Sequence, residues 1–253
     1  MIVIDVGNTN IVIGIYSKKK LIKVFRTNTT KNKKKFLSEF KSFLEAKEKF
    51  IFNKKNKICV LSSVVPSLNL SIKKTFTKKH LKFYIIDPQN ISMNIKINYK
   101  LNQIGPDRIA NYAAVYNKKI FNSIIIDFGT ATTFDVIKNN EYDGGIIFPG
   151  ITLSMNSLIS HTELLRKSKI SKVKKLVARD TVSSIKSGFY FGYLHAINGV
   201  LKQIITENKF KPKIYLTGGL GEIFKDKIDF KPIYKKYLTL EGIRVIGEHI
   251  NHE

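Results

Sequence analysis

The chain has 253 residues, of which 43% are hydrophobic and 25% are charged, which is the composition of a globular protein. Its one cysteine, Cys59, excludes an internal disulfide and a multi-thiolate metal site. No apolar run approaches the roughly 20 residues that span a bilayer. The N-terminal MIVIDVGNT lacks the basic start of a signal peptide. We therefore expect a cytoplasmic protein without a membrane segment.

The net charge of +25 comes from 44 Lys and Arg against 19 Asp and Glu. Such a charge attracts polyanions, so a nucleic-acid-binding protein has to be considered. Only five of the basic residues are Arg, the residue that recognises phosphates and bases with a bidentate fork. Lys, Asn and Ile, which share A/T-rich codons, are all abundant. We interpret the charge as a solvated lysine surface and do not expect a nucleic-acid partner.

The first half of the chain predicts strands and helices in alternation. Apolar, β-branched runs indicate strands, and helical spacing of Phe and Leu indicates helices. In chain order we expect strands at Ile2–Asp5, Ile11–Tyr16 and Leu21–Arg26, a helix at Lys33–Phe50, a strand at Lys57–Ser63, a helix from Pro66 toward His80, and a strand at Phe83–Ile86.

The second half repeats the opening of the first. Strands are expected at Asn122–Asp127, Thr133–Ile137 and Tyr142–Phe148, with a tight turn after the first. Asp5-Val6-Gly7-Asn8-Thr9 aligns with Asp127-Phe128-Gly129-Thr130-Ala131 at an offset of 122 residues. A repeat of about half the chain indicates two similar domains. We expect an N-terminal lobe of residues 1–117, a C-terminal lobe of residues 118–253, and a cleft between them.

The duplicated turn carries a chemical prediction. An Asp that ends a strand before a Gly turn suits a phosphate, because backbone N–H groups can approach the phosphate closely and a hydroxyl adds a donor. The carboxylate can hold the metal that such a phosphate brings. Two such turns, one in each half, would hold a polyphosphate between them.

A glycine turn and a predicted helix start are two further candidate functional stretches. No Walker-type phosphate loop occurs, and the glycine turn Thr217-Gly218-Gly219 suits a flat group such as adenine or is a plain strand-to-helix turn. Gly105-Pro106-Asp107-Arg108 precedes an Ala-spaced helix pattern, so Asp107 is expected in the first helical turn. On the sequence alone, Asp107 serves either the helix dipole or catalysis.

Six motifs in this order resemble those of the type III pantothenate kinases, also called the Baf family. They are DVGNTN, GPDRIAN, IDFGTATTFDVI, GGIIFPGI, DTVSSIKSGFYFG and LTGGLG, and they extend over Met1 to Gly221. The resemblance implies an α/β fold of duplicated ribonuclease H-like domains, as in the actin-like ATPases. It also implies ATP-dependent phosphorylation of pantothenate to 4′-phosphopantothenate, the first step of coenzyme A biosynthesis. Pro106 and Asp180 stand where the family usually has Ala and Asn.

The resemblance implies roles for individual residues. Asp107 would accept the proton of the pantothenate hydroxyl. Asp127 would hold a monovalent cation, K⁺ or NH₄⁺, and Asp5 is assigned to Mg²⁺. The residues expected to bind pantothenate are Tyr99, Gly105, Pro106, Asp107, Arg108 and Thr181. Those expected to bind ATP are Asp5, Val6, Gly7, Asn8, Thr9, Asn10, Ile11, Val12 and Thr130.

The family also implies a homodimer, because its acceptor pocket lies at a dimer interface. Two other functions remain open on the sequence. One is phosphorylation of a different small molecule, a sugar or an acid, by a kinase of the same superfamily. The other is a basic DNA-binding transcriptional accessory protein, although no helix-turn-helix or other DNA-reading motif is recognisable.

Overall fold

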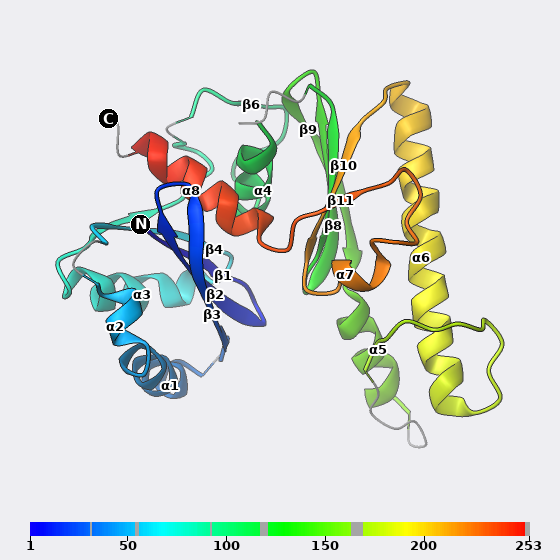
Figure 1. The fold of residues 1–253 in the computed structure, drawn as a ribbon, viewed down its shortest axis with the longest axis horizontal. Helices are drawn as coiled ribbons and strands as arrows, with labels where there is room; N and C mark the ends of the chain where they lie inside the picture. The colour runs from blue at the N-terminus through cyan, green and yellow to red at the C-terminus, as the bar shows by residue number, and fades with distance from the viewer. Residues whose placement is uncertain (31, 54–55, 92, 117–120, 163–168, 251–253) are drawn as a thin grey trace. The chain divides into compact units, whose positions relative to one another are not determined.

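The computed structural model describes residues 1–30, 32–53, 56–91, 93–116, 121–162 and 169–250. Contacts within the chain divide it into two compact units (Figure 1). The first unit consists of Met1–Lys119 together with Leu238–Glu253, and the second of Ile120–Tyr237. The boundary expected at residue 117 falls outside the described residues.

The first unit contains a five-stranded sheet and its covering helices. In chain order its elements are β1 (Ile2–Val6), β2 (Asn10–Ser17), β3 (Lys20–Asn28), α1 (Lys33–Glu45), α2 (Glu48–Ile51), β4 (Ile58–Ser63), α3 (Pro66–Thr77), β5 (Lys82–Ile85), β6 (Lys96–Ile97), α4 (Pro106–Tyr116) and, from the end of the chain, α8 (Leu238–Ile250).

The second unit contains another sheet, a long helix and several short elements. In chain order these are β7 (Ser123–Phe128), β8 (Ala131–Lys138), β9 (Glu141–Pro149), α5 (Ile151–Ser160), α6 (Thr181–Asn208), β10 (Lys213–Gly218), α7 (Gly221–Phe224) and β11 (Ile233–Tyr234).

Five strands of each sheet share one topology, which confirms the duplication expected from the sequence. The order β3-β2-β1-β4-β5 has its equivalent in β9-β8-β7-β10-β11. In each set of five, the first three strands in sequence are antiparallel neighbours, and the remaining two add in parallel. Even the irregularity is repeated, between Ile15 and Tyr16 in β2 and between Val136 and Ile137 in β8.

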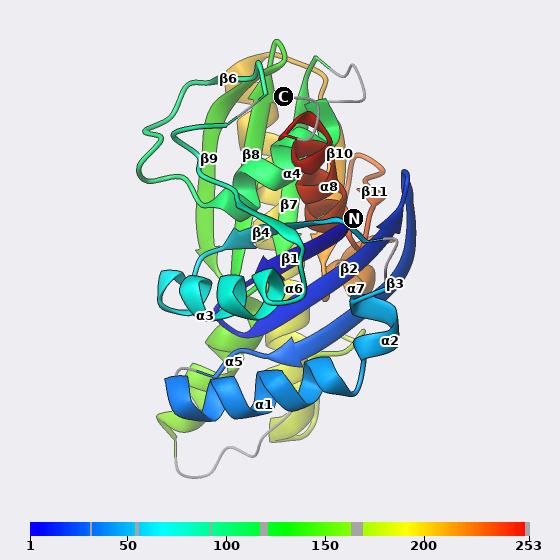
Figure 2. The same ribbon diagram turned by 90° about the vertical axis from the view of Figure 1, so that its left-hand side faces the viewer.

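Alternation along β1 directs its side chains to two different layers. Ile2, Ile4 and Val6 are buried in the core that α1 and α3 cover (Figure 2). Helices α4 and α8 pack against each other and against β4, and α8 also packs on β1. They approach closely because Gly242 has no side chain, and a Cβ there would lie 1.7 Å from the carbonyl oxygen of Ala110. The helix expected from the Ala spacing is therefore present as α4, and it is closely packed.

In the core of the second unit, the side chains of the central strand alternate in the same way as those of β1. Ile124, Ile126 and Phe128 on β7 are buried against the apolar face of α6, which includes Tyr190 and Leu194. Phe128 and Tyr190 both stack on Phe224 of the short helix α7. Asp127 alternates with these apolar residues and therefore faces away from this core.

Two features differ from the sequence prediction. The helix expected over Lys33–Phe50 is two helices, because the chain turns at Ala46–Lys47 and thereby buries Ile51 completely. Residues 238–253, expected in the C-terminal lobe, belong with the first unit instead, because the buried face of α8 packs on α4 and β1.

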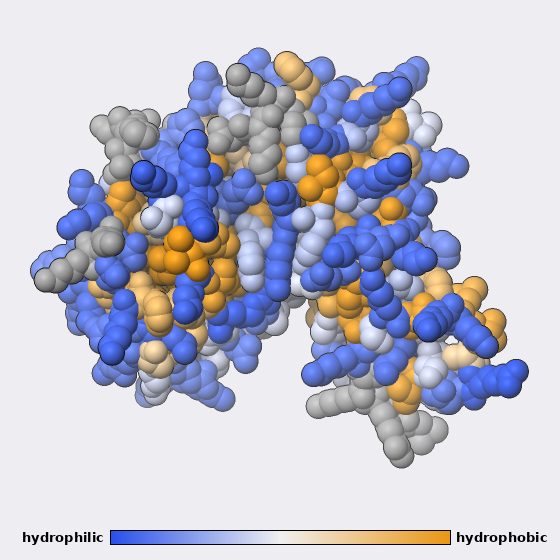
Figure 3. All heavy atoms as spheres, in the orientation of Figure 1, coloured by the Kyte–Doolittle hydropathy of each residue, from blue (hydrophilic) through white to orange (hydrophobic). Residues whose placement is uncertain are grey.

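The exposure of the lysine side chains agrees with the interpretation of the net charge as a solvated lysine surface. No Lys side chain is buried among the described residues, and hydrophilic side chains cover much of the face drawn in Figure 3. In the part of the chain that the structure describes, no helix has both the length and the apolar character needed to cross a bilayer.

Candidate functional site

Asp107 lies in the first turn of α4, and its side chain folds back over Gly105. A Cβ on Gly105 would lie 2.3 Å from Oδ1 of Asp107, so the carboxylate occupies space that only glycine leaves open. The same oxygen accepts a hydrogen bond from the backbone N–H of Arg108, at 2.9 Å. The start of the helix thus fixes the direction of this carboxylate.

The environment of Asp107 changes its acidity. Burial raises the pKa of its carboxyl above the ordinary 3.8, and the Arg108 backbone N–H and charge oppose that rise only in part. A carboxylate that is partly stripped of water holds a proton more strongly than a solvated one. This is the direction in which a general base is tuned.

Arg108 follows Asp107 in α4 and lies beside Tyr99. The Arg108 side chain is 5% exposed, and its guanidinium carbon lies 5.6 Å from the centre of the Tyr99 ring. A guanidinium over an aromatic ring is held by a cation–π attraction. Tyr99, whose segment shows no helix or strand pattern, therefore joins Gly105, Asp107 and Arg108 in one cluster.

The first duplicated turn lies at the same edge of the sheet as the start of α4. β1 and β4 are parallel, so Asp5 and Ser62 are neighbours near their carboxyl ends. The next residue after β4, Val64, donates from its backbone to the Val6 carbonyl at 3.0 Å. Its side chain also lies 3.6 Å from where a Gly105 Cβ would be. The Asp5 turn and the Asp107 cluster are thus brought to one edge of the first unit.

The turn itself exposes only part of the predicted ATP-binding stretch. The Gly7 backbone N–H donates to the Asn10 carbonyl at 2.9 Å, and the Thr29 hydroxyl donates to the Gly7 carbonyl at 2.7 Å. Asn8 and Thr9 are exposed at the tip. The side chains of three predicted residues are buried in the unit, namely Val6, Ile11 and Val12. Those three can meet a ligand only through their backbone.

The second duplicated turn repeats this geometry with one residue fewer. The Gly129 backbone N–H donates to the carbonyl of Ala131, the equivalent of Asn10, at 3.0 Å. Asp127 lies opposite Thr133 in the hairpin, whereas Asp5 lies opposite Val12, so the offset falls from 122 to 121 residues across the turn. Thr130 is exposed at the tip, and the buried strand extends one residue beyond the predicted end at Asp127, to Phe128.

Two glycines enclose this second turn. A Cβ on Gly150 would lie 2.1 Å from the Thr130 carbonyl oxygen, and the Gly150 N–H donates to that oxygen at 3.1 Å. Gly218 has a φ of +83°, and a Cβ there would lie 2.7 Å from Oδ1 of Asp127. The glycine turn predicted at Thr217–Gly219 therefore lies directly against the Asp127 carboxylate.

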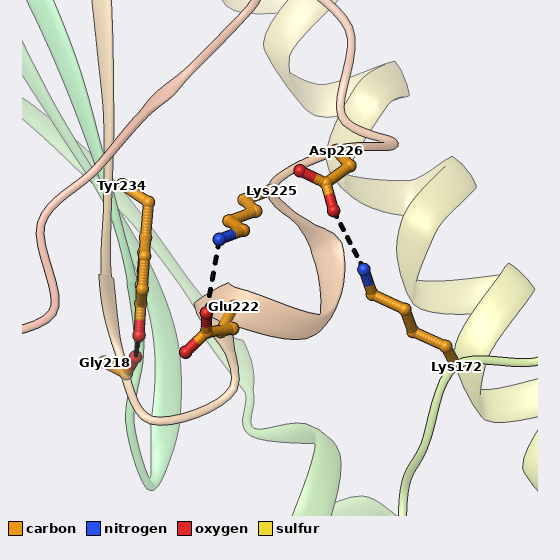
Figure 4. A network of polar contacts seen from close by, with 6 residues as sticks. All are labelled: Lys172, Gly218, Glu222, Lys225, Asp226 and Tyr234. Carbon is orange, nitrogen blue, oxygen red and sulfur yellow. Dashed lines mark hydrogen bonds and ion pairs between the residues drawn. The ribbon is translucent and has the colours of Figure 1, made fainter.

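Tyr234 in β11 supports the glycine turn, a role that the sequence analysis missed. Its hydroxyl donates to the Gly218 carbonyl at 3.3 Å, and its ring lies 3.0 Å from the position of a Cβ on Gly221 (Figure 4). Nearby, Lys225 pairs with Glu222 at 3.2 Å and Lys172 with Asp226 at 2.8 Å. Strand β11 has only two residues and no recognisable pattern, so no sequence signal could have found Tyr234.

Thr181 begins α6 in the second unit and is exposed. The residue before it, Asp180, is the N-cap, because its carboxylate accepts from the Ser183 backbone N–H at 2.9 Å. That hydrogen bond lowers the pKa of Asp180. The acidic residue at this position thus has a structural partner in the chain itself.

The acidic residues at the two turns suit a metal that is held mainly by its substrate. Among the described residues, no group of three or more His, Cys, Asp or Glu side chains gathers as a metal site. Mg²⁺ commonly binds one or two carboxylates and completes its shell with water and phosphate oxygens. Asp5 and Asp127, each at the end of a strand beside a glycine turn, fit that arrangement.

The chain is similar to known proteins over most of its length. The family model of the type III pantothenate kinases matches residues 1–203. The type III pantothenate kinase of Persephonella marina is 42% identical over 95% of each chain. A solved structure from Campylobacter jejuni, described as a candidate Baf family transcriptional activator, is 25% identical, covers 99% of this chain and 100% of its own, and has a TM-score of 0.60.

The fold class is confirmed by more distant structures. MreB 5 of Spiroplasma citri, solved with AMPPNP, is only 12% identical but superposes with a TM-score of 0.56 over 99% of this chain and 96% of its own. That likeness concerns the fold alone. Together with the two equivalent sheets, it confirms duplicated ribonuclease H-like domains of the actin-like type. The match of the family model and the identity with curated relatives show that the chain belongs to the type III pantothenate kinase family.

Proposed function

We propose that this protein transfers the γ-phosphoryl group of ATP to the primary hydroxyl of pantothenate, giving 4′-phosphopantothenate and ADP. This is the first step of coenzyme A biosynthesis, and a cytoplasmic location fits an enzyme that consumes ATP. The observation that carries the proposal is the Asp107 carboxylate, held over Gly105 at the start of α4, with its pKa raised by burial.

Asp107 acts as the general base. A primary alcohol is a poor nucleophile at neutral pH, and a carboxylate that accepts its proton helps as the new bond to phosphorus forms. The hydroxyl oxygen attacks the γ-phosphorus, the bond to the β–γ bridging oxygen breaks, and ADP leaves with that electron pair. The Asp107 carboxylate takes the proton from the hydroxyl. Positioning and charge stabilisation supply most of the remaining catalysis.

The two duplicated turns bind the nucleotide phosphates. Asn8 and Thr9 in the first turn and Thr130 in the second present polar groups at exposed tips. Asp5 is assigned to Mg²⁺ and Asp127 to the monovalent cation, and these ions would offset the negative charge of the phosphates. The glycine turn at Gly218, fixed by Tyr234, lies next to Asp127 and is assigned to the adenine side of the nucleotide.

Pantothenate is assigned to the cluster around Arg108. It carries a carboxylate, and the buried Arg108 follows Asp107 directly in the chain. Tyr99 holds the guanidinium from one side, while Gly105 and Pro106 shape the start of α4. Thr181 is the one pantothenate residue assigned to the second unit.

The decisive experiment compares the purified protein with its Asp107→Asn variant in an ADP-release assay with ATP, Mg²⁺, K⁺ and pantothenate. We expect kcat to fall by roughly 10²–10⁴, the usual contribution of a general base. The carboxylate must be ionised to accept a proton. In the wild type, kcat/KM should therefore fall as the pH drops through a pKa above 3.8. The variant should lack this acidic limb.

The matched control is Asp229→Asn, which removes an exposed carboxylate. Its kcat should equal that of the wild type. Because burial disfavours the ionised Asp107, the neutral Asn variant should have a melting temperature at pH 7 equal to or higher than that of the wild type. A loss of activity in this variant would then not result from a loss of folding. Turnover of sugars alone would favour the other kinase class. Salt-sensitive DNA binding without turnover would favour the accessory protein.

We also propose that the enzyme is a homodimer. Helix α6 exposes Gly188 and Gly192 one turn apart, where a Cβ would have no neighbour within 4 Å. Glycines on an exposed helix face allow close approach of a second helix. In the same unit, Ile147 and Leu153 are 64% and 53% exposed. Sedimentation should give twice 28.9 kDa for the wild type and a smaller mass for Gly192→Leu, whereas a monomeric wild type would refute the dimer.

A further inference from the structure

Residues of α1, α2 and α3 and of the turns beside them line a partly open cavity of about 510 Å³ that no part of the proposed active site uses. Its apolar lining comes from Phe40 and Leu44, which are 3% exposed, from Leu37 and from Phe52. Leu37 keeps 41% of its surface exposed. The volume lies within the roughly 300–1,000 Å³ range of small-molecule sites.

The rim of this cavity carries an excess of positive charge. Four lysines and two glutamates line it. Lys41 pairs with Glu45 at 3.8 Å, and Lys79 pairs with Glu48 at 2.5 Å. In the part of the chain that the structure describes, the remaining two, Lys74 and Lys78, have no carboxylate partner.

Lys74 and Lys78 are placed to act together. Lys74 is in the last turn of α3 and Lys78 is its C-cap with helical backbone angles, so the two lie four residues apart on the same face, one turn from each other. Both line the cavity whose floor is apolar. Two ammonium groups beside an apolar pocket complement a molecule with a hydrocarbon body and one anionic end.

We propose that this cavity binds an anionic amphiphile, a carboxylate with an unbranched acyl chain of medium length. The acyl chain lies on Leu37 and Phe52, the apolar lining residues that keep exposed surface, and the carboxylate lies between Lys74 and Lys78. The ligand removes apolar surface from water at one end and satisfies two cations at the other. The site lies wholly within the first unit and is independent of the assignment of the phosphoryl-transfer site.

The convergence of three helices on the cavity favours a small molecule over a peptide helix. A peptide helix is about 10 Å across with its side chains and would need an open groove along α1 or α3. The lining instead converges from three helices on one volume. An acidic amphipathic peptide is the other occupant that the charge would accept, and the experiment distinguishes it.

The test is calorimetric titration of the full-length protein with decanoate below its micelle concentration, with decanol as the uncharged comparison. We expect saturable one-to-one binding of decanoate that is weaker at higher salt, and weaker binding of decanol. The double variant Lys74→Ala/Lys78→Ala should weaken decanoate binding by at least about tenfold. The matched double variant Lys73→Ala/Lys82→Ala removes the same charge from lysines outside the cavity and should bind like the wild type.

A second pair of variants tests the apolar floor. Leu37→Glu places a carboxylate at the mouth of the cavity and should abolish binding, whereas Leu70→Glu, at a 70% exposed position on α3 outside the cavity, should not. ADP release with pantothenate reports whether each variant is folded. The proposal is overturned if decanoate does not saturate, if both double variants bind equally, or if an acidic amphipathic peptide binds the cavity and decanoate does not.

Discussion

The direction of the Asp107 carboxylate depends on an atom that is absent from its neighbour. Gly105 has no Cβ, and Oδ1 of Asp107 lies where that atom would be. The carboxylate is therefore held close to the backbone at the start of α4 and exposed to less water, which raises its pKa. At this position, glycine leaves free the space that the Asp107 carboxylate occupies.

We predict that Gly105→Ala reduces kcat/KM roughly 100-fold, because displacing a reacting group by about 1 Å has an effect of that size. The new methyl group would lie 2.3 Å from Oδ1, so the carboxylate must move. The measurement is steady-state kinetics with pantothenate as the varied substrate, together with a thermal melt. Gly199→Ala, where a Cβ meets nothing within 4 Å, is the control and should be fully active. Equal activity of both variants would contradict the assigned role.

At the residue scale, the sequence points to the proposed reactive groups but not to their structural supports. Asp107 and Arg108 are proposed because they belong to a motif at a helix start, and the structure brings Tyr99 to Arg108. Gly150 and Tyr234 were missed as supports of the second turn, because each acts through a contact with a residue distant in sequence. Such contacts become visible only when the fold is known.

At the scale of elements, Asp180 shows how a helix start determines a residue's role. Its carboxylate accepts from the Ser183 N–H and its backbone carbonyl accepts from the Ser184 hydroxyl, so it closes the first turn of a 28-residue helix. The hydrogen bond lowers its pKa. Asp180 therefore contributes stability at pH values above 3.8, and this contribution is lost as the pH falls through the lowered pKa.

We predict that Asp180→Ala lowers the melting temperature at pH 7 and that the difference from the wild type shrinks at pH values below the lowered pKa. Asp180→Asn retains a cap and should show a smaller, pH-independent difference. Thermal melts followed by circular dichroism at several pH values measure both variants. A difference for Asp180→Ala that is unchanged at acid pH would contradict the role of the ionised cap.

Strands were predicted more reliably than helix boundaries for a physical reason. The buried strands β1, β4 and β7 are nearly continuous apolar runs, which few other structures accommodate. The break between α1 and α2 depends instead on burying Ile51 in the core, a tertiary contact. The register of the second hairpin was misjudged by one residue after Gly129, because turn length is set by backbone hydrogen bonds that sequence alignment does not contain.

At the scale of the molecule, the duplication predicted the topology of both sheets but not the assignment of the last helix. A repeat of the opening strands says nothing about where the end of the chain lies. The end returns to the first unit because Gly242 allows α8 to pack on Ala110 of α4, and because Leu240 lies against the glycine gap at Gly14 in β2. The Thr239 hydroxyl also donates to the Asn111 side chain at 2.9 Å.

This arrangement predicts that deleting residues 238–253 unfolds the first unit and spares the second. Without α8, the buried faces of α4 and β1 become exposed to water, and α4 is the helix that carries Asp107. Hydrogen exchange should show lost protection in β1 and β4 and retained protection in β7 and β10, with no ADP release. Uniform loss of protection throughout the chain would contradict the division into two units. Full protection of β1 would show instead that α8 is not part of the first unit's core.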